Sequence, residues 1–222
     1  MNAAILVAAG TSSRMGFDKP TALLAGIPLI AHSLRAIQSC PDIALAALVC
    51  SPERVQEFTG LAAPYPKFQH IVPGGAQRGT SVLHGLQALA SASPLLVAVH
   101  DAARPLATPA LFSSVLTAAN THGAASAAQP VADSLHRTDA SGTLYQSISR
   151  ANLFAMQTPQ AARADILLSA LLAHHATATD EVSALIAEGV HPLPVIHDSP
   201  NFKITYPQDL VIAEALATTH SL

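Results

Sequence analysis

The chain has 222 residues, 50% of them hydrophobic and only 11% charged, which excludes a disordered chain and suits a single α/β domain with a large core. Its 11 Lys and Arg and 14 Asp and Glu give a net charge of −3, so the composition predicts neither a nucleic-acid partner nor a membrane partner. The longest apolar runs are far shorter than the about 20 residues of a membrane-spanning helix, and two isolated cysteines favour a reducing, cytoplasmic location.

Short apolar runs rich in β-forming residues alternate with longer segments of helical spacing. The predicted strands are 3–9, 43–50, 69–72, 95–100, 124–129 and 191–196. The predicted helices are 28–39, 78–90, 109–120, 161–172, 180–188 and 207–217. This alternation is typical of a mostly parallel sheet with crossover helices, so we expect a three-layer, Rossmann-like α/β fold.

The polar segment 131–149 interrupts the alternation. It places Asp139-Ala140-Ser141-Gly142 between two short runs, which predicts a protruding β-hairpin arm. Two interpretations of this arm remain open. It reaches a partner subunit, or it is an ordinary solvent-exposed hairpin.

The first candidate functional segment is LVAAGTSSRMGFDKP, at 6–20, directly after the first predicted strand. Its small residues allow backbone N–H groups to approach phosphate oxygens, and Arg14 and Lys19 add positive charge. The spacing from Gly10 to Lys19 does not fit a P-loop, and no second glycine completes a dinucleotide fingerprint. The segment therefore predicts a phosphate-binding loop of another kind, with a plain strand-to-helix turn as the alternative.

The second candidate segment is PGGAQRGTSVLHGL, at 73–86. Gly74 and Gly75 end a strand, and Arg78, Thr80 and Ser81 open a helix. Backbone amides and a hydroxyl at such a place suit recognition of a base edge or a sugar. A glycine turn followed by a helix cap is the structural alternative.

The third candidate segment is VHDAARP, at 99–105, which ends an apolar strand with Asp101 and Arg104. Ligands of open α/β sheets bind at the carboxyl ends of the strands, and a carboxylate there suits Mg²⁺ shared with phosphates. The alternative is a structural ion pair between Asp101 and Arg104. We expect His100 to pack or to orient the loop rather than to transfer protons.

Three more segments follow: RANLFAMQTPQ at 150–160, TDEVSAL at 179–185 and NFKITYPQDL at 201–210. With these six segments in order, nearly the whole chain resembles the cytidylyltransferases that act on 2-C-methyl-D-erythritol 4-phosphate in the non-mevalonate isoprenoid pathway. The resemblance implies one domain over 1–222 with a nucleotide-diphospho-sugar transferase-like fold. It also implies CTP and a polyol phosphate as substrates, Mg²⁺ as cofactor, 4-diphosphocytidyl-2-C-methyl-D-erythritol and pyrophosphate as products, and a homodimer completed by the arm.

The resemblance also implies roles for individual residues. The implied catalytic residues are Arg14, Lys19, Arg150 and Lys203. The implied CTP-binding residues are Ala8, Ala9, Gly10, Gly75, Ala76, Ser81 and Asp101, and Asp101 is also the implied metal ligand, directly or through water. The implied polyol-phosphate-binding residues are Arg104, Ser134, Thr158 and Thr179. Attack of one phosphate on another needs positive charge and alignment more than a covalent nucleophile, which suits these cationic residues.

The sequence departs from the family pattern at several positions. Thr11-Ser12-Ser13 replaces the second glycine of the first loop, and Lys19 precedes Pro20 where the family has a lysine after a proline. Ser134 stands where threonine is usual, and Ala76 stands where an acidic or larger residue is often found. Lys19 is therefore the implied catalytic residue whose position departs most from the family pattern.

Two other functions remain as alternatives. A ribitol-5-phosphate cytidylyltransferase has the same fold and most of the same motifs. A non-catalytic nucleotide-binding protein would be expected to have lost at least one of Arg14, Lys19, Asp101 and Lys203, and this chain keeps them all.

Overall fold

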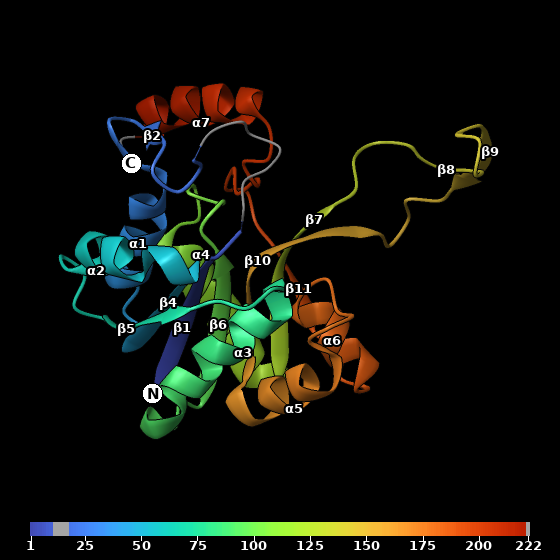
Figure 1. The fold of residues 1–222 in the computed structure, drawn as a ribbon. Helices are drawn as coiled ribbons and strands as arrows, with labels where there is room; N and C mark the ends of the chain where they lie inside the picture. The colour runs from blue at the N-terminus through green and yellow to red at the C-terminus, as the bar shows by residue number, and fades with distance from the viewer. Residues whose placement is uncertain (11–17, 221–222) are drawn as a thin grey trace.

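The structure, a computed structural model, describes residues 1–10 and 18–220. Its central layer is a sheet of β1 (Asn2–Ala8), β4 (Leu45–Cys50), β5 (Phe68–Pro73), β6 (Leu96–Asp101), β7 (Ala124–Pro130), β10 (Phe154–Arg163) and β11 (Leu193–Ile196). The seven strands lie in the order β11-β7-β10-β6-β1-β4-β5 (Figure 1). All pairings are parallel except those of β10, so the predicted mostly parallel sheet is confirmed.

Helices cover both faces of this sheet (Figure 1). They are α1 (Leu29–Ser39), α2 (Val55–Ala62), α3 (Arg78–Leu89), α4 (Pro109–His122), α5 (Ala164–His174) and α6 (Glu181–Ala187). The helix α7 (Pro207–His220) packs in a separate, smaller core, and two short 3-10 helices are η1 (Pro52–Arg54) and η2 (Ala90–Ala92). Alternate β1 residues enter different cores: Leu6 packs with α1, α2 and α4, and Ile5 packs with α3, α5 and α6. This period of two is what a strand buried on both faces requires.

The sequence prediction was wrong in one central place. Residues 154–163 form β10, an antiparallel strand between β6 and β7, so the helix expected from residue 161 begins only at Ala164. Ala161 pairs with both Ala98 and Ala125, and its side chain is fully buried. Sheet pairing therefore overrides the helical preference of this alanine-rich stretch. The helix α2 and the small hairpin of β2 (Leu23–Leu24) and β3 (Ile27–Pro28) were also not predicted.

The predicted arm is present. β8 (Leu135–Thr138) and β9 (Leu144–Ile148) form an antiparallel hairpin that extends away from the body of the molecule (Figure 1). Asp139 holds its turn, since one carboxylate oxygen accepts from the backbone N–H groups of Ser141 and Thr143, both at 2.9 Å. Leu144 and Tyr145 are 64% and 63% exposed, which is unusual for large apolar side chains in a strand.

The parallel strands bring several chain segments to one edge of the sheet. Val7 lies opposite Asp101, and Ala8 lies opposite Cys50, so the carboxyl ends of β1, β4 and β6 are adjacent. A third, smaller core joins α7 to this edge through Leu24, Leu106 and Ile204. None of the helices within 1–10 and 18–220 has the length and apolar character to cross a membrane.

Candidate active site

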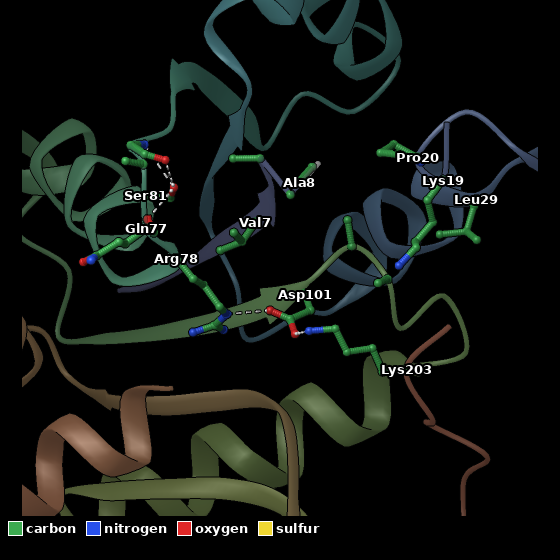
Figure 2. A pocket seen from close by; sticks show the side chains of 16 residues that line it. Val7, Ala8, Lys19, Pro20, Leu29, Gln77, Arg78, Ser81, Asp101 and Lys203 are labelled. Carbon is green, nitrogen blue, oxygen red and sulfur yellow. Dashed lines mark hydrogen bonds and ion pairs between the residues drawn. The ribbon is translucent and has the colours of Figure 1, made fainter. Parts of the chain in front are cut away.

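A pocket of about 370 Å³ opens at the carboxyl ends of β1 and β6, beside the start of α3 (Figure 2). Its lining includes most of the residues that the sequence singled out for phosphate and nucleotide binding. These are Ala8, Ala9, Gly10, Lys19, Gly75, Ala76, Ser81, Asp101 and Lys203. Arg14, the other expected cation of the first loop, lies outside the residues that the structure describes.

The side of the pocket next to α3 is built from small residues in close contact. A Cβ on Gly74 would lie 2.6 Å from the Ala9 side chain and 2.8 Å from Oγ of Ser81, so only glycine fits there. Gly75 donates its N–H to Oγ of Ser81 at 3.1 Å, and this hydroxyl donates to the carbonyl of Gln77 at 3.1 Å. Ser81 is therefore buried and shapes the loop from which the backbone faces the pocket.

An ion-pair network crosses the floor of the pocket (Figure 2). Asp101 accepts from Nε of Arg78 at 2.9 Å on one oxygen and from Nζ of Lys203 at 2.7 Å on the other. Burial by itself raises the pKa of Asp101, but the charges of Arg78 and Lys203 outweigh it and hold that pKa well below its usual range. These partners replace the Asp101–Arg104 pair that the sequence offered as the structural alternative.

The same network continues to a buried carboxylate that sequence reasoning missed. The Nη atoms of Arg78 donate to the two oxygens of Glu181 at 2.7 and 3.0 Å, and Glu181 is 1% exposed. Burial lowers the pKa of Arg78, but Glu181 and Asp101 outweigh this effect and raise it. A signal for Glu181 was available: it precedes the buried residues Ala184 and Leu185 by three and four positions, so it lies on the apolar face of α6, where a charge needs a partner.

The donor set at this site does not fit a metal ion held by protein ligands. Both oxygens of Asp101 already accept from cations, so a metal would have to displace Arg78 or Lys203. The described part of the chain contains no group of three or more His, Cys, Asp or Glu side chains that could hold a metal. The arrangement is suited to an anion or to a metal that arrives already bound to one.

Residues beneath the pocket hold Asp101 in place. Oγ1 of Thr158 accepts from the backbone N–H of Asp101 at 3.0 Å and lies 3.0 Å from Nδ1 of His100. Nε2 of His100 lies 3.1 Å from the carbonyl of Arg104, which fits a neutral ring that donates from Nε2 and accepts at Nδ1. Thr158, an expected substrate contact, is only 3% exposed and instead holds the end of β6 through Asp101. His100 orients the loop as expected, through its contact with the carbonyl of Arg104.

We expect the buried His100 to make stability depend on pH. Burial lowers its pKa from 6.5 to about 4, so the unfolded chain binds a proton that the folded chain resists. The contribution of His100 to the free energy of unfolding is therefore fully present above pH 6.5. It falls by on the order of 3 kcal/mol as the pH drops toward 4. Urea unfolding of wild type and His100→Gln at several pH values checks this. The comparison is made between pH 4.5 and 6.5, about the range set by the two pKa values. If the free energy of unfolding depends on pH as steeply in the variant as in wild type, other groups cause the dependence.

The remaining predicted residues that the structure describes are not among those that line the pocket. Nη1 of Arg104 donates to the carbonyl of Asn201 at 2.9 Å. Thr179 is exposed before α6, and its N–H donates to Oγ of Ser183 at 3.0 Å. Ser134 and Arg150 are exposed on or beside the arm, where Arg150 donates to the carbonyl of Ala132. One chain thus gathers the expected CTP-binding residues but not the expected polyol-phosphate-binding residues.

Comparison with known proteins identifies the family to which this arrangement belongs. The family model for IspD, 2-C-methyl-D-erythritol 4-phosphate cytidylyltransferase, matches residues 2–219. Curated enzymes of that name from Chromobacterium violaceum and Cereibacter sphaeroides are 40% and 39% identical, with 96% of each chain covered.

Solved structures agree with the sequence relatives. The 2-C-methyl-D-erythritol 4-phosphate cytidylyltransferase of Thermus thermophilus is 31% identical, has a TM-score of 0.79, and is covered over its full length by 98% of this chain. A synthase from Anaerococcus prevotii at 23% identity shares the fold, with a TM-score of 0.85 and 96% of its chain covered by 98% of this one. The chain belongs to the 2-C-methyl-D-erythritol 4-phosphate cytidylyltransferase (IspD) family.

Proposed function

We propose that this chain joins CTP to 2-C-methyl-D-erythritol 4-phosphate, giving 4-diphosphocytidyl-2-C-methyl-D-erythritol and pyrophosphate, in the pocket at the ends of β1 and β6. The family match over residues 2–219 supports the reaction. The observation that carries the location is the convergence of Lys19, Lys203 and the small residues after β1 on one cavity. Such a set supplies backbone donors and positive charge for a triphosphate.

The chemistry follows from the charges that must meet. An oxygen of the methylerythritol phosphate attacks the α-phosphorus of CTP, and the bond to the β-phosphate oxygen breaks, so the electron pair leaves with pyrophosphate. The attacking phosphate is already ionised and needs no strong general base. Lys203, fixed by Asp101 at 2.7 Å, and Lys19 stabilise the charge that builds up on the phosphates.

Mg²⁺ enters this proposal as part of the nucleotide substrate. Because both oxygens of Asp101 are engaged, we place the ion on the phosphate oxygens of CTP. We expect EDTA to abolish pyrophosphate release and added Mg²⁺ to restore it. The Mg²⁺ concentration for half-maximal rate should be the same in wild type and in Asp101→Asn, measured at saturating CTP. A rise of about tenfold or more in the variant would instead make Asp101 a metal ligand.

The arm supports a homodimer in which each active site is completed by the other subunit. Ser134 and Arg150 lie with the exposed arm and away from the pocket of their own chain, and Leu144 and Tyr145 are uncovered. Burying such side chains between subunits contributes about 1.5–3 kcal/mol each.

We expect deletion of 139–143 to weaken both dimerisation and activity, because Asp139 organises the turn of the hairpin. Sedimentation velocity and pyrophosphate release, measured on the same preparations, check this. A monomeric deletion variant with full activity would refute it. The substitution Arg163→Ala, at an exposed ion pair away from the arm, is the control and should change neither property.

The choice of acceptor and nucleotide tests the reaction type. Pyrophosphate release should require CTP and a polyol phosphate together, and UTP or ATP should replace CTP poorly. Binding of CTP without any release of pyrophosphate would favour the alternative of a non-catalytic nucleotide-binding protein.

Cys40 and Cys50 are both free and buried, which supports the further proposal of a reducing, cytoplasmic location.

A further inference from the structure

A cluster of charged residues next to the phosphate loop has no role in the chemistry described so far. Arg54, at the end of η1, binds Asp18 with both Nη atoms, at 2.6 and 2.9 Å, although the two residues are 36 positions apart. A bidentate pair of this kind fixes the direction of the carboxylate as well as its position. Burial raises the pKa of Asp18, but hydrogen bonds from Arg54 and Thr21 outweigh this effect and lower that pKa below its usual range.

The Arg54 side chain is itself held from two other sides. Its Nε and Nη2 atoms donate to the carboxylate of Glu57, both at 2.8 Å, and the guanidinium lies 4.7 Å from the centre of the Phe58 ring. Phe58 is fully buried in the core beneath α2. Arg54 is therefore a rigid anchor that belongs to the body of the protein, not a mobile surface side chain.

Asp18 connects this anchor to the pocket. Its carboxylate also accepts from the hydroxyl of Thr21, and its carbonyl accepts from the N–H of Ala22 at 3.1 Å. Pro20 is buried, and its carbonyl accepts from the N–H of Ile30 at 3.0 Å. Lys19 thus lies between two fixed residues, and Figure 2 shows its side chain extending into the pocket.

We infer that Arg54 is a positioning residue for cytidylyl transfer: by holding Asp18, it fixes the backbone from which Lys19 reaches the triphosphate of CTP. This inference rests on the proposed function. It also gives a physical account of the departure in the first loop. The residue after Pro20 is Thr21, and its hydroxyl donates to Asp18. The positive charge of this loop therefore comes from Lys19, before the proline, and the position of Lys19 depends on the contact between Asp18 and Arg54.

We expect the loss of activity to appear in the kinetic constants for CTP. Arg54→Ala should lower kcat/KM for CTP by about 10- to 100-fold, because displacing a catalytic group by about 1 Å has effects of this size. KM for methylerythritol phosphate should change by less than about twofold, since Lys19 acts on the nucleotide side. Asp18→Asn should give a similar loss, and the double variant no further loss, because both changes break one contact. Arg54→Lys should recover part of the activity by keeping the charge without the bidentate geometry.

The control is Arg163→Ala, which removes the same charge from an exposed ion pair with Asp165 at 3.0 Å. Arg163 lies opposite Leu96, at the amino end of β6 and away from the pocket, so this variant should keep wild-type kinetics. Melting curves of all variants establish that each is folded at the assay temperature. The inference is overturned if Arg54→Ala keeps kcat/KM for CTP within about twofold, or if KM for methylerythritol phosphate rises as much as KM for CTP.

Calorimetric titration with CTP and Mg²⁺ separates this inference from the proposed function. If wild type releases no pyrophosphate with any acceptor, the proposed reaction fails. The affinity for CTP, measured in the presence of Mg²⁺, then decides whether Arg54 has the positioning role. Binding that is about tenfold weaker in Arg54→Ala than in Arg163→Ala supports it, and equal binding contradicts it.

Discussion

Replacing Lys203 with Gln is expected to lower kcat/KM for cytidylyl transfer by about 10²- to 10³-fold, the usual cost of removing one group that stabilises charge in a transition state. The ammonium group of Lys203 lies at the pocket wall, fixed by Asp101 at 2.7 Å, so it is oriented before substrate arrives. Glutamine keeps most of the side-chain length but removes the charge. The loss should therefore appear mainly in kcat.

The control for this prediction is Lys203→Arg, which keeps the positive charge. It should retain more activity than the Gln variant, though less than wild type, because a planar guanidinium cannot reproduce the geometry of an ammonium group. Asp101 still accepts from Arg78 in both variants, so both should fold. A Gln variant with kcat/KM within about threefold of wild type would remove Lys203 from the catalytic residues.

The second large effect is expected on stability. Arg78→Met should lower the free energy of unfolding by about 3–5 kcal/mol, because it leaves Glu181 as a buried carboxylate without its cation. The side chain of Glu181 is 2% exposed, so water cannot replace the guanidinium. The double variant Arg78→Met/Glu181→Gln should recover part of this loss, since it removes the buried charge as well as its partner.

Urea unfolding of wild type, both single variants and the double variant completes this cycle. Simple additivity of the two single effects would contradict a direct interaction between Arg78 and Glu181. A fall of less than about 1 kcal/mol for Arg78→Met would show that the pair is no more than a surface ion pair.

The arrangement of layers could be predicted from the sequence because it depends on local patterns. Strands such as β1 and β6 are short apolar runs, and a parallel sheet with crossover helices has few ways to bury them. The position of β10 could not be predicted in this way. Ala161 and Ala162 are good helix formers, and only their pairing with strands far along the chain makes them extended.

The candidate site could likewise be predicted from the sequence only in part. Motif resemblance placed Gly75, Asp101 and Lys203 in one site, and the structure brings them to one pocket. The partners that orient these residues were not predicted. Arg78 and Glu181 are 103 positions apart, and Arg54 and Asp18 are 36 apart, so their pairing depends on how the helices pack on the sheet.

The measurement that tests the account most directly is pyrophosphate release with CTP and Mg²⁺, run in parallel with 2-C-methyl-D-erythritol 4-phosphate and ribitol 5-phosphate. Lys203→Gln serves as the blank. We predict release with the methylerythritol phosphate, and kcat/KM for ribitol 5-phosphate at least about 10²-fold lower, because a site built for one polyol leaves polar groups unpaired with the other. Release with ribitol 5-phosphate alone, or with neither acceptor, would contradict the proposed function.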